Sequence, residues 1–241
     1  MPRPLRTSVG GVAYHVLNRA NARAGLFDSD EDYQAFECVL AQAYERIGVP
    51  VAAYCIMPNH FHLVLCPPEN GQLSAFMQWL TVTHTQRWHA SHGTSGTGHL
   101  YQGRFKSFPI QQDAHFLTVM RYVERNALRA RLVRRAEDWR WCSLWRRRNV
   151  RGEASAYLLP VGEWPVSPPR NWLAVVNRAE TAEELDVLHR CVNRGTPYGQ
   201  GPWLSRTVRT LGLESTLRPR GRPRKHPARP AKQPRKRRKD S

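Results

Sequence analysis

Apolar and polar positions along the first half of the chain predict four strands. Residues 11–19 (GVAYHVLNR) alternate with a period of two, as a half-buried strand does. Residues 49–57 and 60–66 are two apolar runs joined by Pro58-Asn59, a turn pair, so we expect them to form an antiparallel hairpin. Residues 100–110 form a fourth segment with strand character.

Apolar residues spaced three or four apart predict three helices between and after these strands. The first begins at a cap, Ser29 or Asp30, and continues to Ile47, where Gly48 is a stop signal. The second spans residues 72–92. The third begins after the cap Asp113 and continues to about residue 131.

The resulting order, β-α-β-β-α-β followed by a helix, predicts an α+β fold of the ferredoxin-like, split β-α-β type. We expect an antiparallel sheet with its helices on one face. The other face of the sheet would then be open, and such a face is a common platform for nucleic acid.

Composition narrows the function classes. The chain of 241 residues has 37 Lys and Arg against 19 Asp and Glu, a formal net charge of +18, and its hydrophobic share of 41% is enough for a core. No apolar run approaches the roughly 18 residues of a membrane span, and the N-terminus lacks the apolar segment of a secretory signal. Five scattered cysteines without a CxxC pair are typical of reduced core residues. We therefore expect a cytoplasmic protein that binds a polyanion.

The positive charge is concentrated at the C-terminus and divides the chain. Residues 218–241 hold twelve Lys and Arg against one acid, a net charge of +11, together with five prolines. This composition predicts a disordered basic tail, either an arm on nucleic acid or a solubilising tail. Its Arg220-Gly221-Arg222-Pro223 run is like an AT-hook, in which Arg220 and Arg222 would enter a minor groove. Before the tail we expect a catalytic domain over residues 1–150 and a mostly helical or irregular accessory region over residues 151–217, with a helix near 181–194.

His60-Phe61-His62 is the most informative triplet. Residues two apart on a strand point to the same face, so His60 and His62 project together while Phe61 faces the core. Two neutral imidazoles can bind one divalent metal, but they are too few for a closed structural zinc site. An open catalytic site that polarises a phosphodiester fits better. The alternative is a pair of ordinary hydrogen-bonded histidines.

The third predicted helix adds a second group of candidates. Tyr122 and Asn126 are one turn apart and share a face that also carries Arg125 and Arg129. Tyr122 is a candidate nucleophile, Asn126 a candidate metal ligand, and the two arginines candidate phosphate clamps. The alternative is a tyrosine at the rim of the core. No GxxxxGK[ST] loop is present, so we expect no nucleotide cofactor.

Several short motifs in consistent order resemble the REP-associated tyrosine transposases, a branch of the single-tyrosine HUH transposases. They are Tyr14-His15-Val16 with Asn18-Arg19, Met57-Pro58-Asn59-His60-Phe61-His62-Leu63, Tyr101-Gln102-Gly103-Arg104-Phe105, Arg121-Tyr122-Val123 with Asn126, Arg129 and Ala130, and Trp139-Arg140-Trp141-Cys142-Ser143. The resemblance covers roughly residues 8–148, and the combination of the MPNHFH run with the Tyr–Asn helix is specific. It implies the HUH endonuclease fold.

The resemblance also implies a metal-dependent endonuclease and strand transferase for single-stranded DNA. His60, His62 and Asn126 would bind Mg²⁺ or Mn²⁺, and the Tyr122 hydroxyl would attack the scissile phosphorus, giving a 5′-phosphotyrosine and a free 3′-OH. The expected partner is single-stranded or hairpin DNA made of short palindromic repeats, in the bacterial nucleoid; protein partners are unknown. The expected DNA-binding residues are Arg19, Arg104, Lys106, Arg125, Arg129, Arg220 and Arg222.

The sequence departs from the family pattern at two positions, and two alternative functions stay open. Where the family often has Pro and Gly, this chain has Ala127 and Arg131, which favour a continuous helix. A non-catalytic nucleic-acid-binding module could use the same fold and basic face. A metal-dependent phosphodiesterase that activates water would leave Tyr122 without a role. Trapping a covalent protein–DNA adduct distinguishes the transferase from both.

Overall fold

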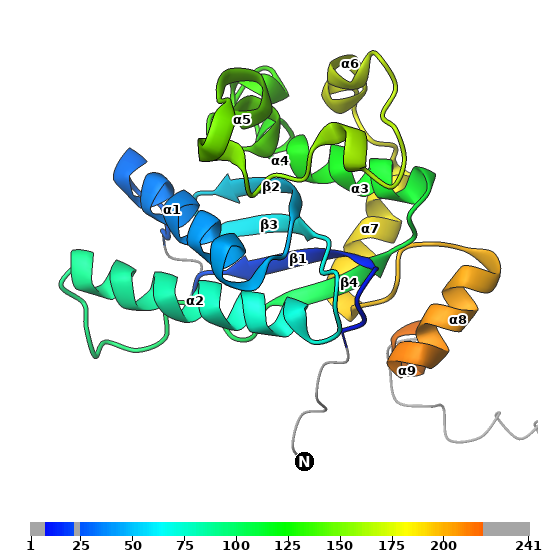
Figure 1. Cartoon of the computed structure of the whole chain (residues 1–241), viewed down its shortest axis with the longest axis horizontal. Helices are drawn as coiled ribbons and strands as arrows, with labels where there is room; N and C mark the ends of the chain where they lie inside the picture. Colours follow the sequence, from blue (N-terminus) through cyan, green and yellow to red (C-terminus); the bar gives the residue numbers. More distant parts are fainter. Residues whose placement is uncertain (1–7, 22–24, 219–241) are drawn as a thin grey trace, which may run out of the picture.

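A four-stranded antiparallel sheet forms the centre of the computed structural model, which describes residues 8–21 and 25–218 (Figure 1). Its strands are β1 (Ala13–Arg19), β2 (Val51–Met57), β3 (His60–Leu65) and β4 (Lys106–Ile110), in the spatial order β2-β3-β1-β4. β2 and β3 form the expected antiparallel hairpin, and β3 pairs with β1. This order, with antiparallel neighbours throughout, confirms the predicted α+β, ferredoxin-like sheet.

Two long helices, α1 (Asp30–Ile47) and α2 (Gln72–Ser91), cover one face of the sheet and pack against each other (Figure 1). Alternation along the strands supplies the apolar side chains beneath them, Val16, Phe61 and Leu63 among others. Ser29 caps α1 in a reciprocal capping box with Asp32, as the sequence predicted for this boundary. The two helices of the split β-α-β unit therefore lie on one face.

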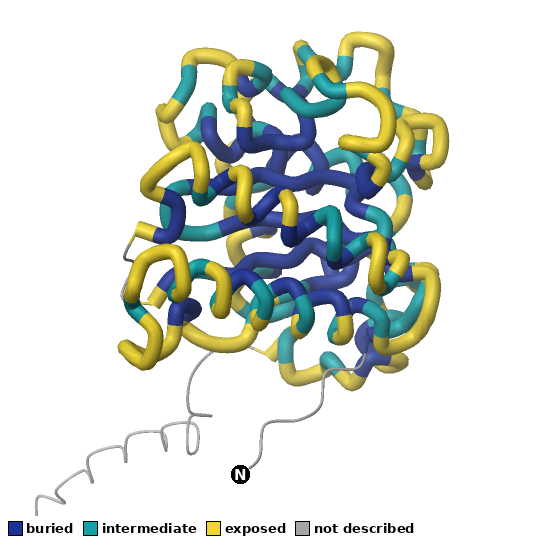
Figure 2. Tube along the Cα trace, turned by 60° about the vertical axis from the view of Figure 1, so that its left-hand side comes forward, coloured by how far each residue is buried: buried dark blue, intermediate teal, exposed yellow. Residues whose placement is uncertain are grey.

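The opposite face of the sheet is not open, and here the sequence-based expectation was wrong. α3 (Ala114–Glu124) and α4 (Asn126–Arg129) pack across it, so that Phe116, Val119 and Val123 are buried against that side of the sheet. The reason is visible in the strands, because β2 is buried along its whole length and therefore needs an apolar partner on both faces. Figure 2 shows the strands as the buried layer between exposed helices.

Residues beyond the split β-α-β unit protect both edges of the sheet. At the β2 edge, the Ile56 amide donates to the Trp141 carbonyl and the Val51 amide to the Tyr157 carbonyl, both at 2.9 Å. At the β4 edge, the Tyr198 amide donates to the Pro109 carbonyl at 2.8 Å. Covered edges prevent pairing with other chains.

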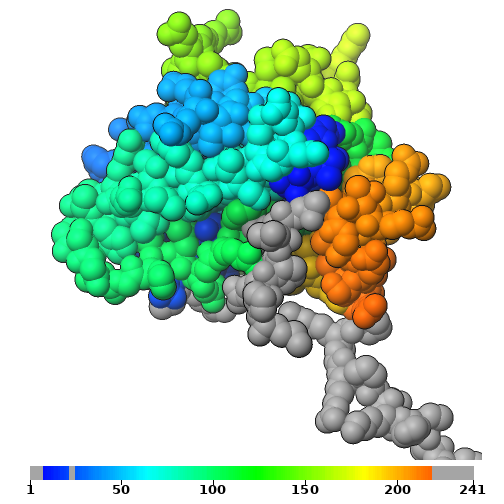
Figure 3. All heavy atoms as spheres, turned by 60° about the horizontal axis from the view of Figure 1, so that its bottom comes forward, coloured from blue at the N-terminus to red at the C-terminus, as the bar shows by residue number. Residues whose placement is uncertain are grey.

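The C-terminal region is helical and shares the core under α3. It contains α5 (Ser143–Asn149), α6 (Trp172–Asn177), α7 (Ala182–Arg194), α8 (Gly201–Leu211) and α9 (Glu214–Leu217), with short 3₁₀ turns between them. Val176, Leu188 and Cys191 are buried in the same cluster as Phe116. Figure 3 shows α8 and α9 at the edge of the molecule, away from the C-terminal end of α2.

Two local features differ from the sequence-based expectation, and one predicted segment lies outside the described residues. The segment at residues 100–110 is a strand from Lys106 onward, because residues 102–104 are exposed and form a loop. The expected continuous helix is interrupted at Arg125, and Arg131 has a φ of +60°. The predicted tail, including Arg220 and Arg222, lies outside the described residues apart from Arg218. No helix among the described residues is long and apolar enough to cross a membrane.

Candidate active site

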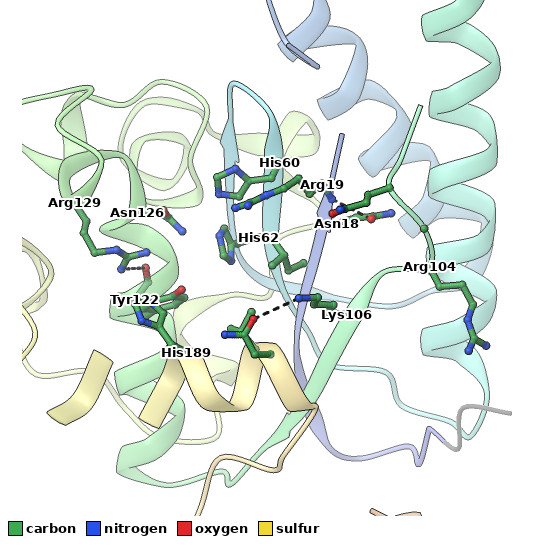
Figure 4. Close-up of a pocket in the computed structure, with 15 residues that line it drawn as sticks. Asn18, Arg19, His60, His62, Arg104, Lys106, Tyr122, Asn126, Arg129 and His189 are labelled. Carbon is green, nitrogen blue, oxygen red and sulfur yellow. Dashed lines mark hydrogen bonds between the residues drawn. The ribbon is translucent and has the colours of Figure 1, made fainter. Parts of the chain in front are cut away.

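A polar cavity of about 630 Å³ opens between the sheet, the α3–α4 segment and α7. The lining residues come from segments far apart in the sequence, and Figure 4 shows their side chains converging. They are Leu17, Asn18, Arg19, His60, His62, Gln102, Gly103, Arg104, Lys106, Tyr122, Asn126, Arg129, His189, Val192 and Asn193. The cavity therefore brings together His60, His62, Tyr122 and Asn126, the four residues proposed from the sequence as metal ligands and nucleophile.

His60 and His62 project from β3 toward α3, with ring centres 5.1 Å apart. His60 is partly exposed, and its Nδ1 lies 2.6 Å from the Asn59 Oδ1. His62 is buried, and its Nδ1 lies 2.9 Å from the Nε2 of His15 on the neighbouring strand. We had expected both rings on an exposed face. α3 and α4 cover that face, so His62 is buried, although its partner is a side chain and not the backbone.

The environment keeps these imidazoles neutral. Burial lowers the pKa of His15 to about 3, and the Arg129 charge contributes. Burial also lowers the pKa of His60 to about 4, helped by Arg19 and Arg129, and holds the pKa of His62 well below its usual range. A neutral imidazole is the form that binds a metal. With Nδ1 engaged in both His60 and His62, Nε2 is the nitrogen that each of these two rings has left for a ligand.

Tyr122 faces the two histidines from α3. Its ring centre lies 5.7 Å from that of His62, and the residue is 4% exposed, more buried than the sequence suggested. Burial raises the pKa of its hydroxyl, an effect that the neighbouring Arg129 opposes. Asn126, one turn later on α4, is also buried, and its Nδ2 has no hydrogen-bond partner. Because burial raises the pKa of the Tyr122 hydroxyl, this hydroxyl needs a proton acceptor before it can act as a nucleophile.

An acidic residue that sequence analysis missed organises the arginines behind Tyr122. The Glu180 carboxylate, whose side chain is 1% exposed, accepts from Arg125 at 3.0 Å and from Arg129 at 3.2 Å. The Arg129 guanidinium lies over the Tyr122 ring, 4.2 Å from its centre. Arg129 lines the cavity, whereas Arg125 pairs with Glu180 outside it.

The remaining basic candidates form the rim on the other side. Arg19 is the last residue of β1 and pairs with His60, Lys106 is the first residue of β4, and Arg104 lies in the loop that leads into β4 (Figure 4). Lys106 and Arg104 are exposed, and the Lys106 Nζ lies 3.5 Å from the Asn193 Oδ1. The described basic residues therefore flank the histidines and the tyrosine without filling the cavity.

α7 contributes two polar cavity residues that sequence analysis also missed, His189 and Asn193, together with the apolar Val192. The sequence predicted the helix, and the i, i+4 spacing places both residues on one polar face. Nothing local indicates that this face meets Tyr122, more than sixty residues earlier. His84, on α2 and outside this cavity, is buried, and its Nδ1 lies 2.7 Å from the Tyr101 hydroxyl.

The donor set fits a divalent cation held in an open site. Among the described residues, no group of three or more His, Cys, Asp or Glu side chains could hold a metal. The cavity instead offers two neutral imidazoles and the side-chain amide of Asn126, whose oxygen is the atom that can bind a cation. His60, His62 and Asn126 would hold the ion, which would neutralise charge on a phosphate. Glu124 does not contribute, because its carboxylate accepts from Ser143 and Trp172, both at 2.9 Å.

Comparison with known proteins identifies the family to which these residues belong. Residues 8–126, which include all four proposed ligand and nucleophile positions, match the family model described as "Transposase IS200 like". The chain belongs to the IS200-like transposase family. This transposase is therefore a member of a class of DNA-cleaving enzymes. No curated protein sequence matches the chain.

One solved structure agrees with the fold of this transposase. A REP-associated tyrosine transposase bound to a REP hairpin is 18% identical, with a TM-score of 0.50, over 64% of this chain and 89% of its own. A protein described as a transposase from Deinococcus radiodurans R1 is 19% identical, with a TM-score of 0.37, over 51% of this chain and 96% of its own. The first likeness confirms the fold expected from the sequence motifs.

Proposed function

We propose that this transposase is a metal-dependent endonuclease and strand transferase for single-stranded, hairpin-forming DNA, acting through a 5′-phosphotyrosine. One observation carries the proposal: the Tyr122 side chain on α3 and the His60–His62 pair on β3 face the same cavity from opposite walls. A scissile phosphate between them would have the nucleophile on one side and the ligand set on the other.

Each residue then has a definite role. The Tyr122 oxygen attacks phosphorus, and the 3′-oxygen leaves. A metal ion bound by His60, His62 and Asn126 would supply charge neutralisation at the phosphate. Arg129 supports the tyrosine ring, and the basic residues Arg19, Arg104 and Lys106 contact the DNA backbone. The covalent bond conserves the phosphodiester energy, so rejoining needs no nucleotide cofactor.

Trapping the adduct tests the proposal. The substrate is a DNA hairpin with randomised single-stranded flanks, which removes the need to know the recognised sequence, incubated with Mn²⁺. DNA labelled at its 3′ end should migrate with the protein on a denaturing gel, whereas DNA labelled at its 5′ end should give a shorter free strand. The opposite label pattern would contradict a 5′-phosphotyrosine.

Tyr122→Phe keeps the ring and removes the nucleophilic oxygen, so the adduct and the cleavage should both disappear while hairpin binding persists. Tyr198→Phe is the matched control, because Tyr198 is buried in the same core but does not line the cavity. Cleavage that survives in Tyr122→Phe would support activated water as the nucleophile. Binding without metal-dependent cleavage in the unmodified protein would support the non-catalytic module.

A further inference from the structure

We propose that His189, on α7, is a further catalytic residue of this transposase, the group that accepts the Tyr122 phenolic proton and returns it when the strand is rejoined. The assignment rests on the proposed function, since it concerns the proton of the same nucleophile. His189 lies outside residues 8–126, which match the family model.

The position of His189 carries the first step of the argument. Its ring centre lies 6.3 Å from that of Tyr122, with the rings at 76°, and both residues line the cavity. Figure 4 shows the two side chains next to each other, on the wall opposite the β3 histidines. Proton transfer requires the Tyr122 hydroxyl and a ring nitrogen of His189 to come within about 2.6–3.2 Å, or to be bridged by one water.

The second step excludes the other cavity groups as proton acceptors. The cavity holds four cationic side chains without an acceptor site and four amides that are not bases. The cations are Arg19, Arg104, Lys106 and Arg129, and the amides are Asn18, Gln102, Asn126 and Asn193. No Asp or Glu is among the described residues that line the cavity. Glu180 is nearby, but its carboxylate faces Arg125 and Arg129.

The remaining imidazoles are already engaged. The His62 Nδ1 lies 2.9 Å from His15, and the His60 Nδ1 lies 2.6 Å from Asn59, which leaves one nitrogen on each ring for a metal. His15 is buried between His62 and the Phe108 ring. The His189 side chain is exposed, and no hydrogen bond from the described part of the chain engages either of its ring nitrogens, so the ring can accept a proton and hold it until the strand is rejoined.

The third step is that packing and an ion pair fix α7, which carries His189, against α3, which carries Tyr122. Leu188 and Cys191 bury the apolar side of α7 beneath α3. Arg121, directly before Tyr122, pairs with Glu184 of α7 at 2.7 Å. Glu184 also closes the capping box at Thr181, where α7 begins. The helix that carries the base is therefore tied to the helix that carries the tyrosine.

The chemical step balances as follows. The O–H bond of Tyr122 breaks, its proton passes to a ring nitrogen of His189, and the phenolic oxygen forms a bond to phosphorus. The bond between phosphorus and the 3′-oxygen breaks, and that oxygen leaves with the electron pair and takes a proton from water. In rejoining, an incoming 3′-OH loses its proton to water and displaces the tyrosine, whose oxygen recovers the proton from the His189 imidazolium.

The experiment measures single-turnover adduct formation at saturating hairpin DNA and Mg²⁺. His189→Ala should lower the rate about 10²- to 10⁴-fold, the usual contribution of a general base. Added imidazole should restore part of the rate in His189→Ala and none in Tyr122→Phe. His189→Gln, which keeps hydrogen bonding but is not a base, should stay slow. Val187→Ala is the control, an exposed position on the same helix outside the cavity, and should be unchanged.

The outcomes separate the two proposals. If the unmodified protein forms no adduct, the proposed function fails and this assignment fails with it. If the adduct forms and His189→Ala is as fast as the unmodified protein, the proton acceptor lies elsewhere and the proposed function stands. A slow His189→Ala that imidazole does not restore, or a His189→Gln that recovers the rate, would make His189 a positioning residue and overturn its role as base.

Discussion

Replacing Glu180 by Gln should destabilise the protein far more than its single charge suggests. The side chain is 1% exposed and is the partner of two guanidinium groups, those of Arg125 and Arg129, which are themselves 13% and 22% exposed. Gln has nearly the same shape but offers one acceptor oxygen and no charge. The substitution therefore leaves two largely buried cations without a counterion.

The expected magnitude follows from that geometry. Removing one partner of a buried ion pair costs about 3–5 kcal/mol, and we expect about 3 kcal/mol because the remaining oxygen can still accept one hydrogen bond. For a chain of this size, 1 kcal/mol corresponds to roughly 2–4 °C in Tm. Glu180→Gln should therefore lower Tm by about 6–12 °C.

Thermal unfolding followed by circular dichroism is the assay, with Asp30→Asn as the control. Asp30 pairs with Arg140 at 3.5 Å, but the two side chains are 65% and 50% exposed, so the loss should stay below about 1 kcal/mol. Equal, small shifts in both variants would show that the carboxylate of Glu180 is not needed to hold the arginines. Bound hairpin DNA offers a second test, because a phosphate that replaces the carboxylate should reduce the loss.

Four further outcomes are expected. Arg131→Gly should raise stability by up to about 1 kcal/mol in the same assay, because Arg131 has a φ of +60°, where an L-residue is strained; a lower Tm would contradict this. Asn126→Ala should raise the Mn²⁺ concentration needed for half-maximal cleavage more than it lowers the saturated rate, since an amide oxygen is a weak ligand; an unchanged titration would place the third ligand elsewhere. Deleting residues 218–241 should weaken hairpin binding and flatten its salt dependence by roughly 0.7 per lost contact, and an identical slope would leave the tail as a solubility element. The free energy of unfolding should fall as pH drops from 6.5 toward 3. Burial lowers the pKa of His15 and of His84 to about 3, so the unfolded chain binds those protons at a higher pH than the folded chain does. If denaturant titrations gave a constant free energy of unfolding over this range, the two histidines would not have lowered pKa values.

Local periodicity was sufficient to predict the fold of the split β-α-β unit and which candidate site residues share a face. Alternation placed His60 and His62 on the face opposite Phe61, and helical spacing placed Tyr122 and Asn126 on one side of a helix; the structure brings all four to one cavity. Both inferences depend on neighbours within one element. Such patterns are fixed by backbone geometry and survive any tertiary arrangement.

The features that sequence analysis missed depend on how elements dock. His15 meets His62 because β1 and β3 pair with Leu17 opposite His62, a register that neither strand specifies alone. The open sheet face was predicted from the β-α-β-β-α-β order, but α3 and α4 cover it, because β2 is apolar on both sides. Burial of Tyr122 and His62 follows from that cover.

Residues from both halves of the chain line the cavity, so residues 1–150 do not form a separable catalytic unit. The part that matches the transposase family supplies the proposed nucleophile and the proposed metal ligands, and it ends at Asn126. The residues that surround the tyrosine come later in the chain. Arg129 lies over its ring, Glu180 pairs with that arginine, and the His189 ring lies beside the tyrosine ring. Because Leu188 and Val176 are buried in the same cluster as Phe116, removing residues 151–217 would expose that core and also remove Glu180 and His189. A protein that ends at residue 150 should therefore lose stability and the proposed base together, whereas His189→Ala removes the base alone.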